Sequence, residues 1–573
     1  MENDKLSKPT KIIRGKDSIT KFFEALFEEE KEIIEHMKRF KKSDIIMTIG
    51  QCEEYKVAKD CSICGGLFTD DNIKVRDHCH VSGKYRGAAH NKCNLQLRLS
   101  PEIPIILHNL KGYDAHHLML KIGEFCKNIR VIPNNMEKYI SFSIGTFRKE
   151  WDKKKKKMIE KERFNLRFID SFAFMSSSLC KLVEDLKASG LDNFKYTSEE
   201  FGPLTDMMTR KGVYPYSYMN KWSKFDVSPK KLKPKHFTND LTGEKISNDD
   251  FNFFVEVCQK FNIKNLGEYH DLYLKTDILL LADVFENFRK TCLSAYKLDP
   301  CHYYTAPGLA WDACLKMTRI ELESLSDIDM HLFFEQGSRG GVSIITHRKG
   351  TANNKYMKHY DPKKPSKYIL NLDANNLYGW SMSQSMPFKG FKWINPTNFR
   401  LRSYKELCSN KLKKGHIIEC DIEYPSKLHD LHNDYPYCPE QVVIKSEMLS
   451  DYSSNIAKQH NTKNYGFTKL ILNLNNKKNY IIHERNLRQA VDAGLIITKI
   501  HRVLGFDQKP WMKPYIDFNT EKRKQAKNEF LKNFFKLMNN SVFGKTMEDV
   551  RRRINVKLIT DENQLTRYIS KPY

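Results

Sequence analysis

The sequence has no run of about 18 apolar residues, the length that a membrane-spanning helix needs, and its first residues, MENDKLSKPTK, lack a signal-peptide pattern. It also contains no internal repeat and no low-complexity tract, which argues against a solenoid. Its 14 cysteines show no framework spacing for disulfides, and only one group lies among histidines. We therefore expect an intracellular protein without a membrane partner, with reduced thiols and one metal site.

The chain is long, rich in core-forming residues and basic. Its 573 residues exceed one ordinary domain, and 40% hydrophobic residues with 12% aromatics can form several cores. Lys and Arg number 96 against 70 Asp and Glu, which gives a formal net charge of +26. This excess favours a polyanionic partner, and we expect nucleic acid.

Two residue pairs in the N-terminal region have the spacing of a four-ligand zinc site, Cys61-x-x-Cys64 and His90-x-x-Cys93. Two such knuckles can hold one tetrahedral ion, so the spacing predicts bound Zn²⁺. We assign the zinc ribbon to residues 58–98. It follows an N-terminal helical segment, residues 1–57, in which apolar residues recur at helical spacing over residues 18–42.

The residues between and after these pairs resemble the ββα-metal (HNH) nuclease of the recombination endonuclease VII type. By this resemblance, Asp77 and Asn94 would hold a catalytic Mg²⁺ and His78 would activate water. A zinc ribbon that only braces the fold or grips DNA has the same ligand spacing. The sequence leaves both interpretations open.

The segment KYILNLDANNLYGWSM alternates like a buried strand up to Asp373 and then changes to a helical pattern. It resembles motif A of family B DNA polymerases, in the Asp-x-Asn-x-Leu-Tyr form of the protein-primed members. The resemblance implies that Asp373 binds the Mg²⁺ ions of a two-metal site. It also implies that Tyr378 lies under the sugar and excludes a 2′-hydroxyl.

A second segment, KLMNNSVFGK, resembles motif B of the same family, Lys-x-x-x-Asn-Ser-x-Tyr-Gly. The resemblance implies that Lys536 neutralises triphosphate oxygens, that Asn540 and Phe543 shape the nascent base-pair pocket, and that Gly544 leaves room near the template. Lys532 and Lys545 would contact DNA.

The motif B segment also has the pattern of an amphipathic helix. At 100° per residue, Phe530, Phe534 and Leu537 share the face opposite to that of Lys532, Lys536, Asn540 and Phe543. A basic helix that only faces solvent is the alternative, and it does not explain the Asn-Ser-x-Phe-Gly end.

Upstream, Arg339-Gly340-Gly341 resembles the Tyr-x-Gly-Gly linker that contacts DNA between exonuclease and polymerase domains, without its tyrosine. Two adjacent glycines let the backbone approach a phosphate closely. We expect all three residues to contact DNA.

Two segments resemble exonuclease motifs of proofreading polymerases. HNLKGYD follows a short apolar strand and resembles the second motif, and YLKTD resembles the third. The resemblance implies that Asn109 belongs to the site, that Asp114 and Asp277 bind metal ions, and that Tyr273 orients the attacking water. Tyr273 and Asp277, four residues apart, lie side by side if this segment is helical.

Between these motifs, Ser171 and Lys211 lie in segments that resemble the places where protein-primed polymerases hold single-stranded DNA and terminal protein. The first exonuclease motif, Asp-x-Glu, does not occur upstream of Asn109, and no Tyr-x-Asp-Thr-Asp of motif C follows Lys545. We expect a truncated polymerase, in which the missing second carboxylate would lower the rate by many orders of magnitude.

As a whole, the chain is identified as a member of the protein-primed family B polymerases, of the organellar and viral type and close to those of Polinton/Maverick elements. This implies a multidomain α/β (α+β) protein. An RNase H-like 3′–5′ exonuclease domain would occupy residues 99–300, a palm with motif A residues 301–396, an insertion for terminal protein and processivity residues 397–510, and fingers with motif B residues 511–573.

The resemblance also implies the partners and cofactors. These are template and primer DNA, deoxynucleoside triphosphates, a terminal protein primer, catalytic Mg²⁺ and structural Zn²⁺, in the nucleus or in association with a virus or mobile element. Two alternatives remain open. One is a catalytically dead DNA-binding remnant, and the other is a zinc-dependent HNH endonuclease.

Overall fold

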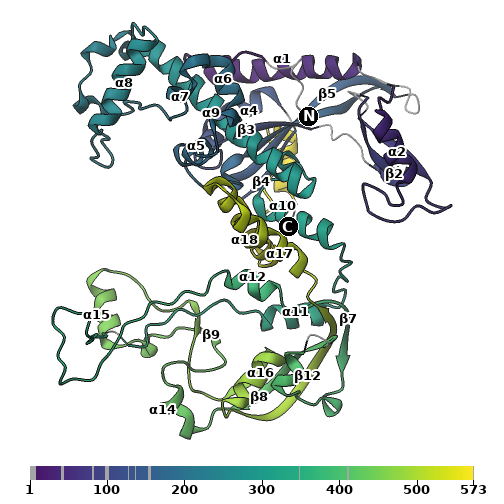
Figure 1. Cartoon of the computed structure of the whole chain (residues 1–573), viewed down its shortest axis with the longest axis vertical. Coiled ribbons are helices and arrows are strands. Elements are labelled where there is room, and N and C mark those ends of the chain that lie inside the picture. The colour runs from purple at the N-terminus through teal and green to yellow at the C-terminus, as the bar shows by residue number, and fades with distance from the viewer. Residues whose placement is uncertain are drawn as a thin grey trace. The chain divides into compact units, whose positions relative to one another are not determined.

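The computed structural model describes residues 8–39, 44–79, 83–96, 102–126, 128–135, 137–152, 157–347, 349–409 and 412–571. The chain divides into two compact units (Figure 1). Unit 1 comprises Met1–Trp311 and Arg523–Tyr573, and unit 2 comprises Asp312–Lys522. The boundaries fall within α10 (Ala306–Thr318) and α17 (Lys513–Gln525).

Unit 1 contains a four-stranded sheet whose order is β3-β6-β5-β4. The strands are β3 (Glu102–Leu107), β4 (Ile129–Pro133), β5 (Tyr139–Asp152) and β6 (Lys157–Asp170). Strand β3, which the sequence predicts, runs parallel to β6, whereas β5 pairs antiparallel with β4 and β6. Leu107 is in register with Asp170, so β3 and β6 end at the same edge of the sheet.

Helices cover this sheet. The predicted N-terminal helix is confirmed as α1 (Ser18–Arg39), and its buried Phe23 stacks on Phe125 of α4 (Asp114–Phe125) at 5.1 Å between ring centroids. After the sheet strands the chain forms α5 (Leu179–Lys187), α6 (Lys195–Phe201), α7 (Thr205–Met208), α8 (Asn248–Lys260) and α9 (Leu266–Tyr296). The Asn265 side chain accepts a hydrogen bond from Glu268 N and so caps α9.

The C-terminal segment of the chain also belongs to unit 1. It forms α18 (Glu529–Thr546) and α19 (Glu562–Ile569), which confirms the predicted motif B helix. Phe534 of α18 meets Phe288 of α9 edge to face at 5.5 Å, and both rings are buried. Aromatic packing therefore joins the motif B helix to the helices of the first half of the chain.

Unit 2 is built on an antiparallel sheet of order β11-β8-β12-β7. Its strands are β7 (Met386–Ile394), β8 (Lys414–Glu423), β11 (Lys477–His483) and β12 (Ile496–Lys509). These strands come from both sides of the boundary predicted at residue 396. The other elements are α11 (Ile328–Gly337), α12 (Leu377–Met382), α13 (Tyr404–Leu407), α14 (His429–His432), α15 (Asp451–Gln459), α16 (Glu484–Asp492), β9 (Glu440–Val443) and β10 (Thr468–Ile471).

The strand predicted immediately before Asp373 is wrong. Residues 368–373 have no regular structure and are exposed, with Leu372 at 85% of its full exposure. Near this segment, the described chain has only the isolated bridge between Asn353 and Lys367, so no neighbouring strand pairs with the alternating residues. Alternation produces a strand only where a partner strand takes up its hydrogen bonds.

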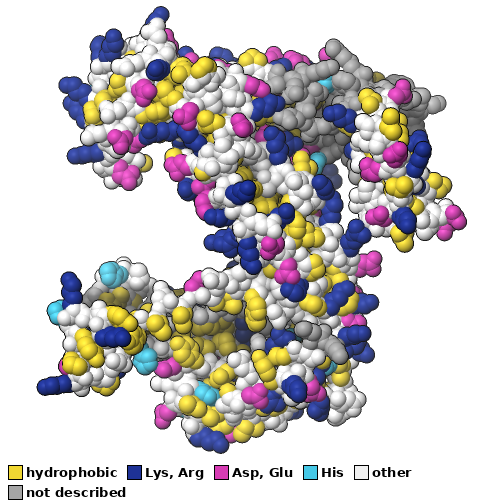
Figure 2. All heavy atoms as spheres, viewed as in Figure 1, with side chains coloured by type: hydrophobic (Ala, Val, Ile, Leu, Met, Phe, Trp, Pro, Cys, Tyr) yellow, Lys and Arg dark blue, Asp and Glu magenta, His cyan; other side chains and the backbone are white. Residues whose placement is uncertain are grey.

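No helix in the described ranges is both long enough and apolar enough to cross a membrane. Basic side chains are spread over the face shown in Figure 2, with acidic ones among them.

Candidate functional site

The second exonuclease-like motif forms the turn between β3 and α4. Asn109 adopts a left-handed backbone with φ 66°, and its carbonyl accepts hydrogen bonds from Gly112 N at 3.0 Å and Tyr113 N at 3.2 Å. A side chain at residue 112 would overlap the Asn109 amide, so this turn requires glycine there. The tight turn brings Asp114 to the first residue of α4.

Asp170 holds this turn in place, a role that the sequence analysis missed. One carboxylate oxygen, Oδ1, accepts from Asn109 N at 2.8 Å and Phe172 N at 3.0 Å, and the other, Oδ2, accepts from Lys111 N at 3.2 Å. Asp170 is the last residue of β6 and is buried. An acidic residue that ends a strand beside the motif strand is the signal that points to it.

Four residues predicted from three separate segments line one cleft of about 910 Å³ in unit 1: Asn109, Asp114, Lys211 and Asp277. They come from the turn after β3, the start of α4, the segment between α7 and α8, and the middle of α9. Lys211 Nζ lies 3.9 Å from Asp277 Oδ2. Glu286 also lines the cleft, which thus combines three carboxylates with one ammonium group.

Burial is the main cause of the shifted pKa values of the two cleft aspartates. It raises the pKa of Asp114, and the nearby Asp170 carboxylate adds to this shift. Burial also raises the pKa of Asp277, while Lys211 and Tyr273 oppose the rise. Asp277 Oδ1 is buried without a hydrogen-bond partner among the described residues. A buried oxygen of this kind fits a divalent cation, which would take up its charge.

Tyr273 lies beside the cleft, one helical turn before Asp277 on α9. Its hydroxyl is 2.6 Å from the Tyr216 hydroxyl. Burial raises the pKa of Tyr273, and the neighbouring Asp277 and Tyr216 raise it further, so the phenol remains protonated. A Cβ at Gly212 would lie 2.9 Å from its ring, so this glycine lets the chain pack closely against Tyr273.

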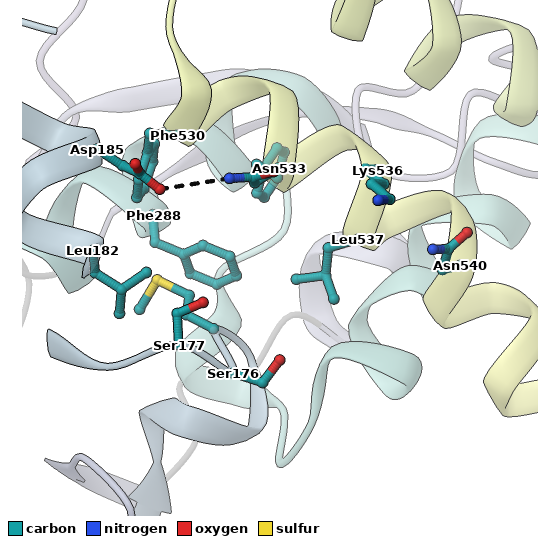
Figure 3. Close-up of a pocket in the computed structure, with 12 residues that line it drawn as sticks. Ser176, Ser177, Leu182, Asp185, Phe288, Phe530, Asn533, Lys536, Leu537 and Asn540 are labelled. Atoms are coloured by element: carbon teal, nitrogen blue, oxygen red, sulfur yellow. Dashed lines mark hydrogen bonds between the residues drawn. The ribbon is translucent and has the colours of Figure 1, made fainter. Parts of the chain in front are cut away.

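The motif B residues line a second cavity of unit 1, of about 330 Å³. Lys536 and Asn540 lie on its α18 side, and the loop with Ser176 and Ser177 lies opposite (Figure 3). Leu537, expected on the other face of the helix, lines the same cavity, because the space extends over more than one face of α18.

The other residues of the motif B helix differ in exposure and in their ion pairs. Phe530 and Phe534 are buried as predicted, whereas Gly544 is exposed and Phe543 is half-buried. Lys532 pairs with Glu529 at 2.7 Å, and Lys545 pairs with Glu548. Surface pairs of this kind contribute little, so both lysines can exchange their partner for a phosphate.

Asp373 and Tyr378 belong to unit 2, whereas Lys536 belongs to unit 1. Asp373 is exposed in irregular chain, and Tyr378, on the short helix α12, is 54% exposed. The helix after Asp373 is therefore confirmed, and the buried strand before it is not.

Two residues expected to contact DNA are engaged within the protein. Ser171 is fully buried, and its hydroxyl bonds Leu107 O at 2.9 Å and His108 Nδ1 at 2.9 Å, so it joins the ends of β3 and β6. Arg339 donates to Ile481 O at 2.6 Å and lies 4.0 Å over the Tyr480 ring. The Ser171 side chain is therefore closed to DNA, whereas half-buried Arg339 stays a predicted DNA contact. Gly340 and Gly341 are exposed with open space around them.

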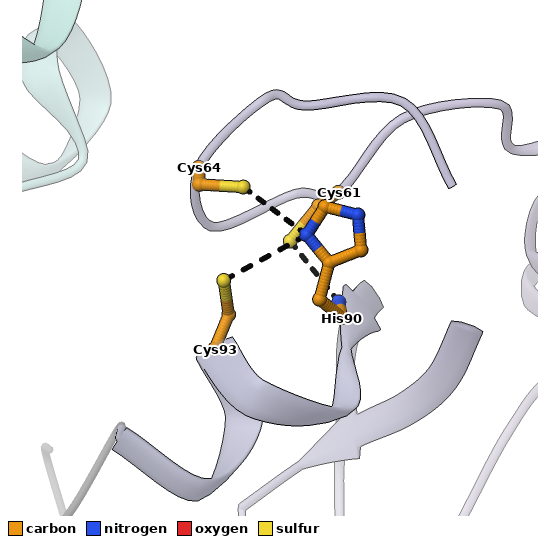
Figure 4. Close-up of side chains that lie close together, drawn as sticks. All are labelled: Cys61, Cys64, His90 and Cys93. Atoms are coloured by element: carbon orange, nitrogen blue, oxygen red, sulfur yellow. Dashed lines mark hydrogen bonds between the residues drawn. The ribbon is translucent and has the colours of Figure 1, made fainter. Parts of the chain in front are cut away.

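The predicted zinc ligands converge in unit 1. One ligand atom from each of Cys61, Cys64, His90 and Cys93 lies within 4.8 Å of all the others (Figure 4). His90 Nδ1 is 3.3 Å from Cys64 Sγ and 3.8 Å from Cys93 Sγ. His90 Nε2 is 3.1 Å from Leu67 O, which leaves Nδ1 for a metal. Three sulfurs and one ring nitrogen fit tetrahedral Zn²⁺.

Two of the thiols have shifted pKa values, in opposite directions. Burial acts to raise the pKa of Cys61, but hydrogen bonds from the backbone of Cys64 and His90 outweigh it and lower this pKa to about 7. Burial and the neighbouring sulfurs raise the pKa of Cys93 to about 11. A bound Zn²⁺ would stabilise both as thiolates.

The surrounding elements have the order of a ββα unit: β1 (Lys74–His78), β2 (Tyr85–His90) and α3 (Asn91–Gln96), which follow α2 (Ile49–Val57). Asp77, a predicted cation ligand, is buried and pairs with Arg86 Nη2 at 2.6 Å. His78 ends β1, and Asn94 lies on α3. Because Arg86 already neutralises Asp77, the carboxylate is engaged within the fold.

Residues 98–571 match the family described as DNA polymerase type B, organellar and viral. A comparison with curated proteins found no match. Among solved structures, the chain is similar to Phi29 DNA polymerase complexed with primer-template DNA and incoming nucleotide substrates. That similarity has 14% identity and a TM-score of 0.39, over 77% of this chain and 59% of that chain.

An orthorhombic crystal form of Phi29 DNA polymerase is also similar, with 13% identity and a TM-score of 0.38, over 83% of this chain and 67% of that chain. The chain thus spans 59% of the length of the first of these two structures.

Proposed function

Because the chain belongs to the type B DNA polymerases of organelles and viruses, we propose that it is a DNA-directed DNA polymerase that also carries a 3′–5′ exonuclease-like site. The observation that carries the proposal is the cleft of unit 1. Residues from motifs far apart in the sequence, Asn109, Asp114, Lys211 and Asp277, line this one space. Chance motif matches in an unrelated fold would not be expected to share a cavity.

In the cleft, each residue has its own role in phosphodiester hydrolysis. Lys211 attracts the phosphate backbone, and Asn109 orients the strand end. Tyr273, kept protonated by burial, can donate a hydrogen bond that orients the attacking water. A divalent cation held by Asp114 and Asp277 would neutralise the scissile phosphate and acidify that water.

For synthesis, the motif B cavity supplies the nucleotide contacts. Lys536 is exposed on α18 and can neutralise triphosphate oxygens, and Asn540, one turn later, can contact the base pair. Asp373 supplies the carboxylate of motif A. Its exposure leaves it accessible to a cation and to substrate.

We also propose the finer features that the resemblance implies. These are initiation from a terminal protein, an origin in a Polinton/Maverick-like element, and the domain division given above. The zinc ribbon, in this proposal, braces unit 1. The Asp77–Arg86 ion pair favours this role over nuclease chemistry, because a cation would have to displace the guanidinium.

The test uses the full chain with Mg²⁺, labelled deoxynucleoside triphosphates and a primer–template. We expect nucleotide binding that Lys536→Ala weakens, and any incorporation by the chain should fall at least a hundredfold in Asp373→Ala and Lys536→Ala, the loss typical of removing one group that stabilises transition-state charge. Lys524→Ala serves as a control on α17. Incorporation that persists in Asp373→Ala would reject the proposal, as would the absence of both incorporation and Lys536-dependent nucleotide binding.

The exonuclease-like site is tested separately, by degradation of 3′-labelled single-stranded DNA. Asp114→Ala and Asp277→Ala should each stop release of nucleotides, and Asp192→Ala, on the surface of unit 1, should not. Degradation that is indifferent to both cleft aspartates would come from a contaminant or from another site.

A further inference from the structure

A third pocket of unit 1, of about 360 Å³, shares no lining residue with the exonuclease-like cleft or the motif B cavity. It forms where the segment before α1 meets the short helix η5 (Trp222–Asp226) and the first turns of α9. Arg14, Lys221, Trp222 and His270 line it. None of the motifs predicted from the sequence includes these residues.

Trp222 dominates the apolar surface of this pocket. Its ring stacks on Phe225, with 5.6 Å between centroids and 26° between planes, and yet the residue is 58% exposed. Phe225 thus supports the indole from one side and leaves a large aromatic surface in water. A flat ring that covers this surface would gain both apolar burial and stacking.

The charged groups of the pocket are the cations Arg14 and Lys221. Arg14 lies 5.7 Å over the Phe225 ring, and its Nε is 3.2 Å from Asp271 Oδ1, which orients the guanidinium. Lys221 is exposed directly before Trp222. Among the described residues that line the pocket, none is acidic. An aromatic surface beside two cations matches a ligand with a flat ring and a negative group, as in a nucleotide.

A continuous aromatic cluster links this pocket to the exonuclease-like site. Phe225 contacts His270 at 5.1 Å, and His270 contacts Tyr214 at 5.4 Å. Tyr214 in turn contacts Tyr273 at 5.0 Å between ring centroids. His270 and Tyr273 are one turn apart on α9, so the same helix carries a wall of each site.

We propose that this pocket binds one nucleotide of single-stranded DNA, whose base stacks on Trp222 and whose phosphate contacts Arg14 and Lys221. The inference rests on the proposed function, because a polymerase with an exonuclease handles unpaired template and primer ends. A single strand is the occupant that the geometry favours. In duplex DNA both faces of each base are already stacked and cannot cover Trp222.

The direct test is photocrosslinking of the full chain to a fifteen-residue oligothymidylate that carries one 5-iodouracil, in a buffer without added Mg²⁺, which suppresses cleavage and leaves the Zn²⁺ site undisturbed. Mass spectrometry of the crosslinked peptides should identify Trp222. Crosslinks confined to other residues, with none at Trp222, would overturn the proposal. The wild-type chain suffices for this readout, so no substitution that could disturb folding is needed.

The affinity for the same oligonucleotide is also compared between the wild-type chain and matched variants. Trp222→Ala should weaken binding roughly tenfold, the effect of losing one stacked base, and Trp222→Phe should retain most of it. Lys221→Gln should reduce the salt dependence of binding, whereas Lys260→Gln, an exposed lysine of α8, should not.

Two results would refute the single-strand assignment: wild-type affinity in Trp222→Ala, or an equal loss of affinity for a blunt duplex of the same length. These assays need no turnover. Their failure is therefore distinct from failure of the incorporation and degradation assays that test the proposed function.

Discussion

Replacing Asp170 by asparagine should loosen the turn that carries the second exonuclease-like motif. The carboxylate accepts three backbone hydrogen bonds, from Asn109 and Phe172 on one oxygen and from Lys111 on the other. Asparagine keeps the shape but has one oxygen and one NH2 group. The Lys111 N–H would then face the amide NH2, which is also a donor, so at least this hydrogen bond is lost. A hydrogen bond to a charged group contributes about 1.5–3 kcal/mol. With the weakening of the other two, we expect a loss of about 2–4 kcal/mol.

Urea unfolding monitored by circular dichroism measures this loss. Asp192→Asn, on the surface of the same unit, is the control and should change the unfolding free energy by less than about 0.5 kcal/mol. In the degradation assay, Asp170→Asn should lower kcat more than it raises KM, because Asn109 and Asp114 lose their fixed positions. Unchanged stability together with unchanged cleavage would refute the reasoning.

Three further predictions concern other parts of the chain. Cys93→Ser should release the bound Zn²⁺ and lower the melting temperature, measured by a zinc-sensitive dye and by calorimetry; an unchanged melting temperature would contradict a structural metal. Phe534→Ala, at a buried ring of α18, should cost about 3–5 kcal/mol in urea unfolding, whereas exposed Lys536→Ala should cost less than about 0.5 kcal/mol. Burial opposes ionisation of Glu484, but its hydrogen bonds to Arg402 and His416 lower its pKa from 4.5 to about 2. Ionised Glu484 therefore contributes about 3 kcal/mol to the free energy of unfolding above pH 4.5, and this contribution is lost as the pH falls toward 2. Glu484→Gln should remove this part of the acid-induced loss of stability.

Features set by local spacing could be read from the sequence. The helical repeat before the zinc site gives α1, and the apolar run before Asn109 gives β3. The zinc ligands are also local in this sense, because Cys-x-x-Cys and His-x-x-Cys each fix two ligands on one turn. The amphipathic pattern around Lys536 gives α18, with Phe530 and Phe534 on its buried side. In each case a local pattern indicates the element, although β3 also needs β6 to take up its hydrogen bonds and the zinc site needs both residue pairs.

Features that depend on tertiary partners could not be read in this way. The alternation before Asp373 predicts a strand, but within the described part of the chain no strand pairs with it. Ser171 has the polar side chain of a ligand contact, yet it joins the ends of two parallel strands. Arg339 has a charge suited to phosphate, but its guanidinium packs on Tyr480 and bonds a backbone carbonyl. Sequence pattern gives the chemistry of a side chain, whereas its partner is a property of the fold.

The two predicted reaction centres differ in how firmly the backbone holds their carboxylates. Asp114 begins α4 and Asp277 lies within α9, so helical hydrogen bonds fix both, whereas Asp373 stands in irregular exposed chain. Because electrostatic catalysis depends on groups held in place before reaction, strand cleavage should need less rearrangement than synthesis. Gly112→Ala separates the two, since its Cβ would overlap the Asn109 amide within the cleft turn. It should slow degradation of single strands and spare nucleotide incorporation, and an equal loss of both activities would show that this turn serves more than the cleft.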